Sequence, residues 1–203
     1  MDAHHGLEVA LSTDHAPRAR VRDLIAGMSP SHDPLEHEHR AQALAWIDSG
    51  APLWRTEAPA TPDPHLVTYI VPFDAATGRV LLVDHRKAGL WLPPGGHAEP
   101  GEDPRATVVR EAREELDVAA VFHSLTDDLP LLLTATPTRG ARPHTDVSLW
   151  FLIDLPATTA IRPDPSEFAA ARWVSVGGHD FVPGVTCEPH LHRLEAKLRS
   201  LTP

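Results

Sequence analysis

The sequence predicts an α/β fold in which a mixed β-sheet is packed between layers of helices. Short β-rich segments, two of them joined as a hairpin, are interleaved along the chain with segments that have helical periodicity. This order is typical of a sheet covered by helices. The hydrophobic content of 42% and the charged content of 23% are those of an ordinary globular protein.

The predicted strands are bounded by turn-forming residues. Residues 65–72 are β-rich, residues 74–78 have the composition of a turn, and residues 79–84 return as a second apolar segment. Two such segments joined by a short turn are typical of a β-hairpin. Further candidate strands follow later in the chain. They are residues 119–123, 131–136, 147–155 and 172–174.

Two helices are predicted from the capping residues that precede them. Asp33 is a good N-cap for a helix over about residues 34–49, which has a partly apolar face. Asp103 is expected to cap a second helix over residues 104–116. Its first residue is a proline, whose missing backbone N–H would have no hydrogen-bond partner within the helix at that position. A third helix is expected to close the chain at residues 189–201.

Residues 1–60 are predicted to form a helical extension to a main domain of residues 61–203, with prolines at the boundary. About the first 15 residues are polar and patternless, so we expect them to be mobile. A short helix is expected around residues 21–25. Three roles are open for the extension: it covers part of the main domain's core, forms a dimer contact, or acts as a lid beside a substrate.

The helix at 104–116 gathers carboxylates on one face. Glu111, Glu114 and Glu115 are three and four positions apart, which at about 100° per residue places them within about a 100° arc. Like charges at this spacing repel each other, so a nearby positive charge is expected. All-oxygen ligands of this kind suit a hard cation such as Mg²⁺ or Mn²⁺.

The neighbouring residues of that helix allow two interpretations. Val109, Ala112 and Leu116 are expected to pack into a core, so that the acids line the edge of a packed surface. In the alternative, the face is solvated and Arg110 and Arg113 neutralise the acids through helical pairs. A glycine loop and a further glutamate precede the helix in fixed register, which favours the metal site.

This register resembles the Nudix box, Gly-x5-Glu-x7-Arg-Glu-U-x-Glu-Glu-x-Gly-U, in which U is aliphatic. Ala112 is a small apolar residue at the first U position, and Asp117 stands where the family has glycine. That glycine resembles a left-handed helix terminator, a conformation that Asp tolerates better than most residues. The departure therefore affects the turn and not the carboxylates. The matching positions are Gly96, Glu102, Arg110, Glu111, Glu114, Glu115 and Val118.

The resemblance implies the Nudix fold, an α/β/α sandwich, over about residues 61–203. It also implies hydrolysis of a diphosphate that is linked to another moiety, usually a nucleoside. Mg²⁺ or Mn²⁺ would be bound by Glu111, Glu114 and Glu115, together with the backbone carbonyl of Gly96. One glutamate, in the box or in a later loop, would accept a proton from the attacking water.

Other residues are expected to support this site. Glu102 and Arg110 would form an ion pair that holds the loop against the helix, since an arginine can clamp a carboxylate with two hydrogen bonds. Glu167 stands where some relatives carry an extra acidic ligand or base, although an ordinary loop carboxylate is an equal alternative. Candidate substrate contacts are Arg86, Lys87 and Trp91.

Composition excludes several classes of protein. The net charge of −10 argues against an extended nucleic-acid surface, while a local basic pocket for phosphates remains open. Cys187 is the only cysteine, so no intrachain disulfide forms. No apolar run approaches membrane-spanning length and the N-terminus lacks signal-peptide features, so we expect a cytoplasmic protein. The histidine pairs 37/39 and 190/192 point to different sides of a helix, so no dedicated histidine–metal site is predicted.

Three functions compete. The first is a metal-dependent diphosphatase with a small-molecule nucleotide substrate, for which a nucleoside triphosphate is our first candidate and ADP-ribose or a nucleotide sugar the next. The second is a sensor that binds such ligands without cleaving them. The third is an isopentenyl diphosphate isomerase, disfavoured because Cys187 is far along the chain from the box. Residues 180–188 loosely resemble MutT enzymes but lack their purine-reading asparagine.

Overall fold

The computed structural model describes residues 3–138, 142–178 and 186–201, with side chains given from residue 15 onward. Its helices are α1 (Ala3–Gly27), α2 (Pro34–Asp48), α3 (Pro104–Leu116) and α4 (Leu191–Leu201). Its strands are β1 (His65–Asp74), β2 (Arg79–His85), β3 (Leu90–Leu92), β4 (Gly95–His97), β5 (Leu132–Pro137), β6 (Thr145–Asp154) and β7 (Phe168–Ser175).

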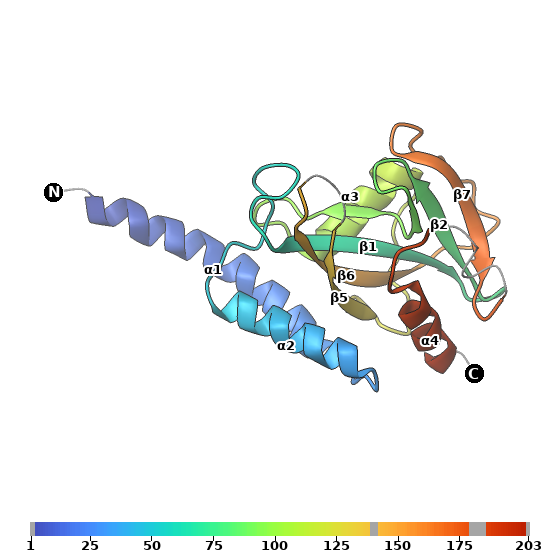
Figure 1. The fold of residues 1–203 in the computed structure, drawn as a ribbon, viewed down its shortest axis with the longest axis horizontal. Helices are drawn as coiled ribbons and strands as arrows, with labels where there is room; N and C mark the ends of the chain where they lie inside the picture. The colour runs from blue at the N-terminus through green and yellow to red at the C-terminus, as the bar shows by residue number, and fades with distance from the viewer. Residues whose placement is uncertain (1–2, 139–141, 179–185, 202–203) are drawn as a thin grey trace.

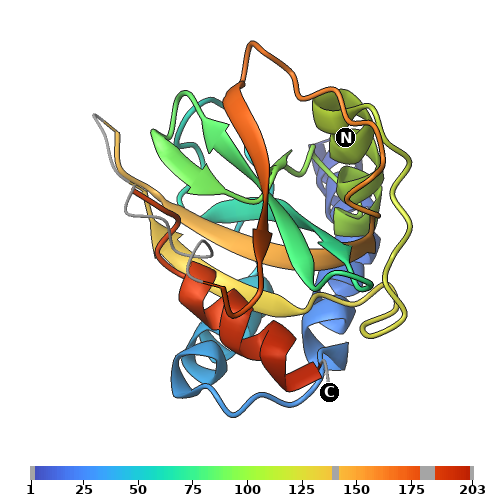
Figure 2. The ribbon, with the colours of Figure 1, turned by 90° about the vertical axis from the view of Figure 1, so that its right-hand side faces the viewer.

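All of these strands belong to one mixed sheet with the main order β3-β2-β1-β6-β5, in which β4 also pairs with β1 and β7 with β2. The long central pair, β1 and β6, is parallel and sets His65 opposite Asp146. The other strand pairs are antiparallel. The predicted hairpin of β1 and β2 is present, and Figure 2 shows the twist of the sheet.

The two faces of the sheet carry different helices, as the alternation of side chains along β6 shows. Leu149, Phe151 and Ile153 belong to a buried cluster with apolar residues of α1, α2 and α3. Trp150 and Leu152 point the other way, into a cluster that α4 completes. Figures 1 and 2 show α4 apart from α3 across the sheet. This arrangement confirms the predicted α/β/α sandwich with helices at the N-terminal end.

The capping predictions are confirmed. Asp33 accepts a hydrogen bond from the Leu35 amide at the start of α2, and Asp103 accepts one from the Arg105 amide at the start of α3. Asp117 ends α3 in the left-handed conformation, with φ 57° and ψ 39°. The aspartate therefore performs the turn that the box glycine performs in the motif.

Three expectations need correction. The helix expected around residues 21–25 continues back to Ala3, through the segment that we expected to be patternless. Val109 is 49% exposed, and Val108 instead joins the core, because positions 108, 112 and 116 form the stripe that faces the sheet. Residues 119–123 form no strand, only a single bridge from Phe122 to the end of β6.

The N-terminal helices cover part of the main domain's core, the first of the three roles considered above. Val21 and Ile25 of α1 and Ile47 of α2 are buried in the same cluster as Ile70 of β1 and Leu116 of α3. Across the described residues, no helix is long and apolar enough to span a membrane.

An ionic cluster fixes α2 against α4. Glu36 is fully buried, and both of its carboxylate oxygens accept hydrogen bonds from Lys197 Nζ at 2.7 Å. Arg40 binds the same carboxylate from one turn further along α2. Asp33, beside its capping bond, accepts a hydrogen bond from Arg193 Nε of α4. These contacts join the extension to the last helix of the chain.

Glu36→Gln is expected to lower the free energy of unfolding by about 3–5 kcal/mol, because it leaves the charge of Lys197 buried without its carboxylate. Denaturant unfolding measures this change. Asp48→Asn, which breaks the exposed pair with Arg22, is the matched control and should destabilise the protein far less than Glu36→Gln. Equal losses in the two variants would show that the buried pair has no special role.

Candidate functional site

The glycine loop lies so close to its neighbours that no other residue type fits. Gly95 has φ +142°, and a Cβ there would lie 2.1 Å from the backbone oxygen of Thr68 on β1. A Cβ on Gly96 would lie 2.2 Å from Glu111 Oε1. Both distances are far below van der Waals contact, so the backbone of β4 directly abuts β1 on one side and the α3 carboxylates on the other.

The three carboxylates of α3 differ in their exposure. Glu111 and Glu115 are buried, whereas the Glu114 side chain is 60% exposed. Glu115 Oε2 accepts a hydrogen bond of 2.7 Å from the Gly95 amide. The predicted edge position of the acids is therefore correct for the group, with two carboxylates under the glycine loop and one at its rim.

Arg110 connects the loop with the carboxylates. Its Nε and Nη2 donate to the two oxygens of Glu102, each at 3.0 Å, so the expected ion pair is present. Its Nη1 donates to Glu111 at 2.8 Å and to Glu114 at 3.2 Å. Nη2 also donates to the backbone oxygen of His97. The guanidinium thus sets the positions of two candidate metal ligands and of the loop.

Arg113 is the other arginine that was expected to neutralise the acids if this face were solvated, and its contacts differ from those of Arg110. Arg113 is exposed and pairs with Asp117 rather than with the glutamates. The interpretation of the whole face as a set of solvated helical pairs is therefore wrong, since Glu111 and Glu115 are buried.

Glu102 is held as a structural carboxylate. Besides Arg110, it accepts hydrogen bonds from the Glu99 amide and from Thr107 Oγ1, each at 2.9 Å. Burial alone would raise the pKa of Glu102, but the hydrogen bonds from Arg110, from the Glu99 amide and from Thr107 bring it below its usual value. Its oxygens are occupied by donors of the chain, which suits an orienting role.

The surroundings of Glu111 and Glu115 carry too little positive charge to offset the burial of the two carboxylates. Burial and the nearby Glu111 raise the pKa of Glu115 to about 9, although the Gly95 amide partly opposes this. Burial also raises the pKa of Glu111, despite its contact with Arg110. Near neutral pH, a cation between these two carboxylates would favour the ionised form of both. Their all-oxygen donor set fits Mg²⁺ or Mn²⁺.

The loop before β7 brings Glu167 to the same site. Its charge acts on both Glu111 and Glu115, whose pKa values it helps to raise. The loop is tied to α3, because the Asp164 amide donates to the backbone oxygen of Glu115 at 2.9 Å. Arg86 Nε donates to the Pro165 oxygen at 3.0 Å, so this arginine holds the loop that carries Glu167.

The remaining candidate substrate contacts lie on the segment before the glycine loop. Lys87 is exposed. Trp91 lies on β3, where the guanidinium of Arg172 covers its ring at 4.4 Å from the centroid. The backbone of Cys187 forms an isolated β-bridge with Trp91, so Cys187 is nearer to the glycine loop in space than along the chain. Burial raises the pKa of its thiol, which keeps it protonated.

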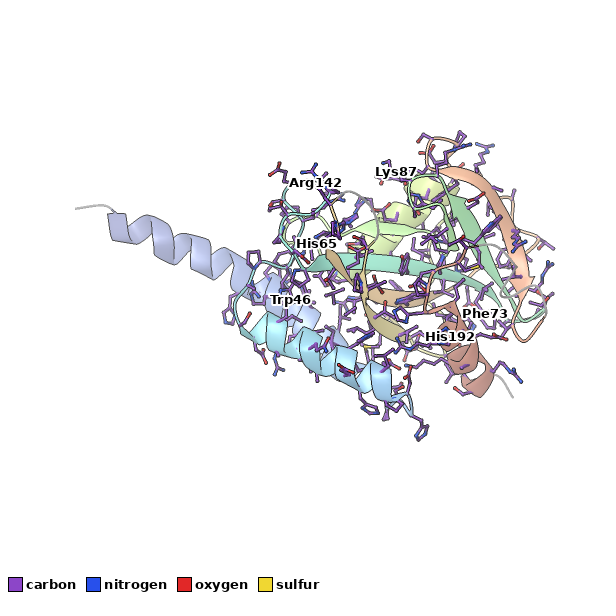
Figure 3. All side chains as sticks on the ribbon, in the orientation of Figure 1. Trp46, His65, Phe73, Lys87, Arg142 and His192 are labelled. Atoms are coloured by element: carbon purple, nitrogen blue, oxygen red, sulfur yellow. The ribbon has the colours of Figure 1, made fainter. Side chains whose placement is uncertain are left out.

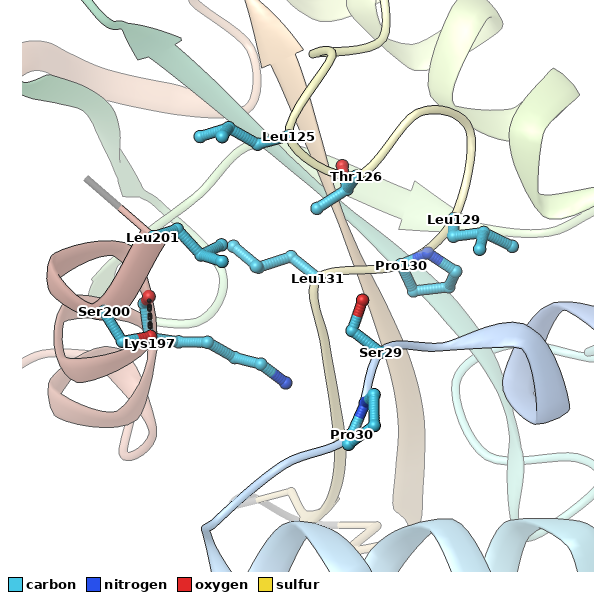
Figure 4. Close-up of a pocket in the computed structure, with 10 residues that line it drawn as sticks. All are labelled: Ser29, Pro30, Leu125, Thr126, Leu129, Pro130, Leu131, Lys197, Ser200 and Leu201. Carbon is cyan, nitrogen blue, oxygen red and sulfur yellow. Dashed lines mark hydrogen bonds between the residues drawn. The ribbon is translucent and has the colours of Figure 1, made fainter. Parts of the chain in front are cut away.

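A small pocket lies elsewhere, between α4, the end of α1 and the segment before β5 (Figure 4). It contains none of the box residues. Its one cation, Lys197, is bound to Glu36. This pocket therefore offers no phosphate-binding charge, and the box carboxylates remain the candidate site. Residues 180–183, part of the stretch that resembles MutT enzymes, lie outside the described residues.

Comparison with known proteins agrees with this geometry. A family model described as the NUDIX domain matches residues 63–183, more than half of the chain. Mouse nucleoside diphosphate-linked moiety X motif 6 is 47% identical over 55 residues, covering 26% of this chain and 18% of that protein. Nudix hydrolase 25 of Arabidopsis thaliana is 32% identical over 100 residues, covering 42% and 57%. An isopentenyl-diphosphate Delta-isomerase of Cereibacter sphaeroides is 28% identical over 106 residues, covering 49% and 58%.

The chain thus spans less than two thirds of the length of these curated relatives. Solved structures share the fold at lower identity. A NUDIX hydrolase from Nitrosomonas europaea has a TM-score of 0.54 at 16% identity, covering 70% of this chain and 91% of that one. The NUDIX domain of Shewanella oneidensis NrtR, complexed with ADP ribose, has a TM-score of 0.51 at 20% identity, covering 66% and 86%. The chain belongs to the Nudix family.

Proposed function

We propose that this protein hydrolyses a phosphoanhydride bond in a nucleoside diphosphate linked to another moiety, with the help of a divalent metal ion. The buried pair Glu111 and Glu115 beneath the Gly95–Gly96 backbone carries the proposal. A cation would favour the ionised form of both carboxylates. On the side of the glycine loop, backbone atoms of Gly95 and Gly96 face them. Cleavage of a phosphoanhydride needs such a charge-neutralising site.

The ligands of Mg²⁺ or Mn²⁺ in this proposal are Glu111, Glu114 and Glu115, with Glu167 and the Gly96 carbonyl as additional ligands. A bound ion would neutralise phosphate oxygens and stabilise the leaving group. Arg110 and Glu102 orient the ligands rather than bind the metal, because their contacts are to each other, to the loop and to Glu111. Glu167 is a candidate general base, as are the box glutamates.

A nucleoside triphosphate is the first candidate substrate, and ADP-ribose or a nucleotide sugar is the next. Lys87 and Arg86 would contact phosphates, and Trp91 would contact the base. The NUDIX domain of NrtR is complexed with ADP ribose, which supports keeping a non-catalytic sensor as the second candidate. The complete set of box carboxylates favours the hydrolase. The isomerase stays disfavoured because the Cys187 thiol is not activated.

The remaining sequence-based expectations stay predictions. These are a homodimer, a cytoplasmic location, a small-molecule partner rather than an extended nucleic-acid surface, and the division into an extension of residues 1–60 and a main domain of residues 61–203.

The first test is turnover of a panel of nucleoside triphosphates, ADP-ribose and nucleotide sugars with Mg²⁺ or Mn²⁺, followed as phosphate, pyrophosphate and mononucleotide release. We expect metal-dependent turnover, and a loss of at least about a hundredfold in kcat for Glu114→Gln and for Glu115→Gln. Glu99→Gln, an exposed glutamate of the same loop, is the control and should keep full activity. Tight binding of one compound without turnover by the wild type would instead establish the sensor.

Arg110→Lys is expected to lower kcat by about tenfold with little change in KM, because lysine keeps the charge but loses the paired hydrogen bonds to Glu102. The double variant with Glu102→Gln should lose little more than either single variant, since both break one unit. Arg105→Lys tests a similar two-bond pair, with Asp103, away from the carboxylates. An equal kcat loss there would contradict a positioning role specific to Arg110.

The metal-free protein is expected to lose stability as pH rises. Glu115 keeps its proton in the folded state up to about pH 9, whereas the unfolded chain releases it near its ordinary pKa of 4.5. Stability from this group is therefore fully present below pH 4.5 and falls between pH 4.5 and 9, by about 1.4 kcal/mol per unit of pKa difference at most.

Chemical denaturation in EDTA at pH 5 and pH 8 measures this effect. Glu115→Gln should be more stable than the wild type at pH 8, with a smaller difference at pH 5, and Mg²⁺ should stabilise the wild type more than the variant. A difference between the two proteins that does not change with pH would refute the assignment.

A further inference from the structure

A second group of metal-binding side chains lies at one end of the central strand pair. His65 begins β1, Asp146 faces it on β6, His144 precedes β6 and His97 ends β4. One ligand atom from each of the four lies within 4.8 Å of every other. The rings of His65 and His144 are stacked with their centroids 4.9 Å apart, and the ring centroids of His65 and His97 are 5.0 Å apart. Figure 3 shows His65 well away from His192 of α4.

The second ring nitrogens of His65 and His144 determine their tautomers. His65 Nδ1 is 2.7 Å from the Pro62 carbonyl, and His144 Nδ1 is 3.0 Å from the Arg142 carbonyl. A carbonyl only accepts hydrogen bonds, so both Nδ1 atoms carry hydrogen. In its neutral form, each ring therefore directs the lone pair of Nε2 inward. Carbonyl contacts of this kind orient metal-binding histidines.

Two of the inward-facing atoms, His65 Nε2 and Asp146 Oδ1, have no hydrogen-bond partner. His65 is fully buried, its Nε2 lies 3.3 Å from Asp146 Oδ1, and both atoms are buried without a hydrogen bond. His144 Nε2 lies at the same distance from the same oxygen. Lone pairs that face each other in a buried site repel, and a cation between them would remove this repulsion.

Among the residues that the structure describes, Arg55 is a cation that lies at the edge of the group. Arg55 Nη1 donates to His97 Nε2 at 3.1 Å, and its charge acts on Asp146 and on Glu111. The close contacts of Asp146 Oδ1 are still those with His65 Nε2 and His144 Nε2. An ion that takes His97 Nε2 must displace this arginine, so the chain provides a counter-charge for the metal-free state.

We propose that His65, His97, His144 and Asp146 bind one transition-metal ion of the Zn²⁺ class. Three imidazoles and a carboxylate form a four-ligand set that such ions prefer, whereas Mg²⁺ prefers oxygen alone. The site is chemically distinct from the carboxylates of α3. It is also adjacent to them, since His97 follows Gly96 and its carbonyl accepts a hydrogen bond from Arg110.

An ion there would join β1, β4 and β6 at the glycine loop. Its binding energy would then stabilise the loop position that Gly96 needs beside Glu111. The sequence alone does not reveal this group, because His65 and His97 are far from His144 and Asp146 along the chain. The pairing of β1 with β6 and with β4 brings them together.

Zn²⁺ and Co²⁺ binding to the full chain provides the test, after treatment with EDTA and in excess Mg²⁺ to occupy the carboxylate site. Calorimetry should give one equivalent of Zn²⁺, and bound Co²⁺ should show the visible absorption of imidazole ligation. Asp146→Asn and His144→Ala should each weaken Zn²⁺ binding by at least about tenfold. Circular dichroism of each metal-free variant verifies that it is folded.

The matched control is Asp154→Asn, because Asp154 forms a comparable contact with His123, 3.2 Å to Nε2, outside the group. Asp154→Asn and Glu115→Gln should both bind Zn²⁺ like the wild type, and Zn²⁺ should raise Tm in these but not in Asp146→Asn. The proposal fails if the wild type binds no Zn²⁺, if Asp146→Asn binds it equally well, or if Glu115→Gln abolishes binding.

Discussion

The contact between the glycine loop and α3 is the constraint on which the site depends. Gly96 lies against Glu111, and the Gly95 amide donates to Glu115, so two carboxylates are buried beneath backbone atoms that carry no side chain. Arg110 fixes the same arrangement from the side through Glu102. A larger residue at Gly96 would push against the Glu111 carboxylate, and one at Gly95 would push the loop away from β1. Either change would disturb the position of the loop over the carboxylates.

Local signals in the sequence were sufficient for much of the fold and for the centre of the site. Asp33 and Asp103 cap their helices through contacts two residues away, and Asp117 adopts its left-handed conformation within one turn. Such features depend on neighbouring residues alone. The resemblance to the Nudix box likewise implied the ion pair of Glu102 with Arg110, which is present.

Features that depend on tertiary packing were not predictable. Val108 and Val109 are adjacent and equally apolar, and only the position of the sheet decides which one is buried. The partners Glu36 and Lys197 come from opposite ends of the chain. The hydrogen bond from Arg86 Nε to the backbone oxygen of Pro165 likewise joins residues that are far apart along the chain. In each case the deciding partner is too distant in sequence for a local pattern to identify it.

The family match ends at residue 183 and begins at residue 63, yet both faces of the sheet are closed by segments outside it. A fragment cut to the matched range would lose α1 and α2 from one face and α4 from the other. The side chains of β6 would then lose the cover of α4 on one face, while α3 alone among the helices would remain on the other. The two ends of the chain should therefore share the hydrogen-exchange protection of the central strands and open with them as one cooperative unit, rather than fray independently.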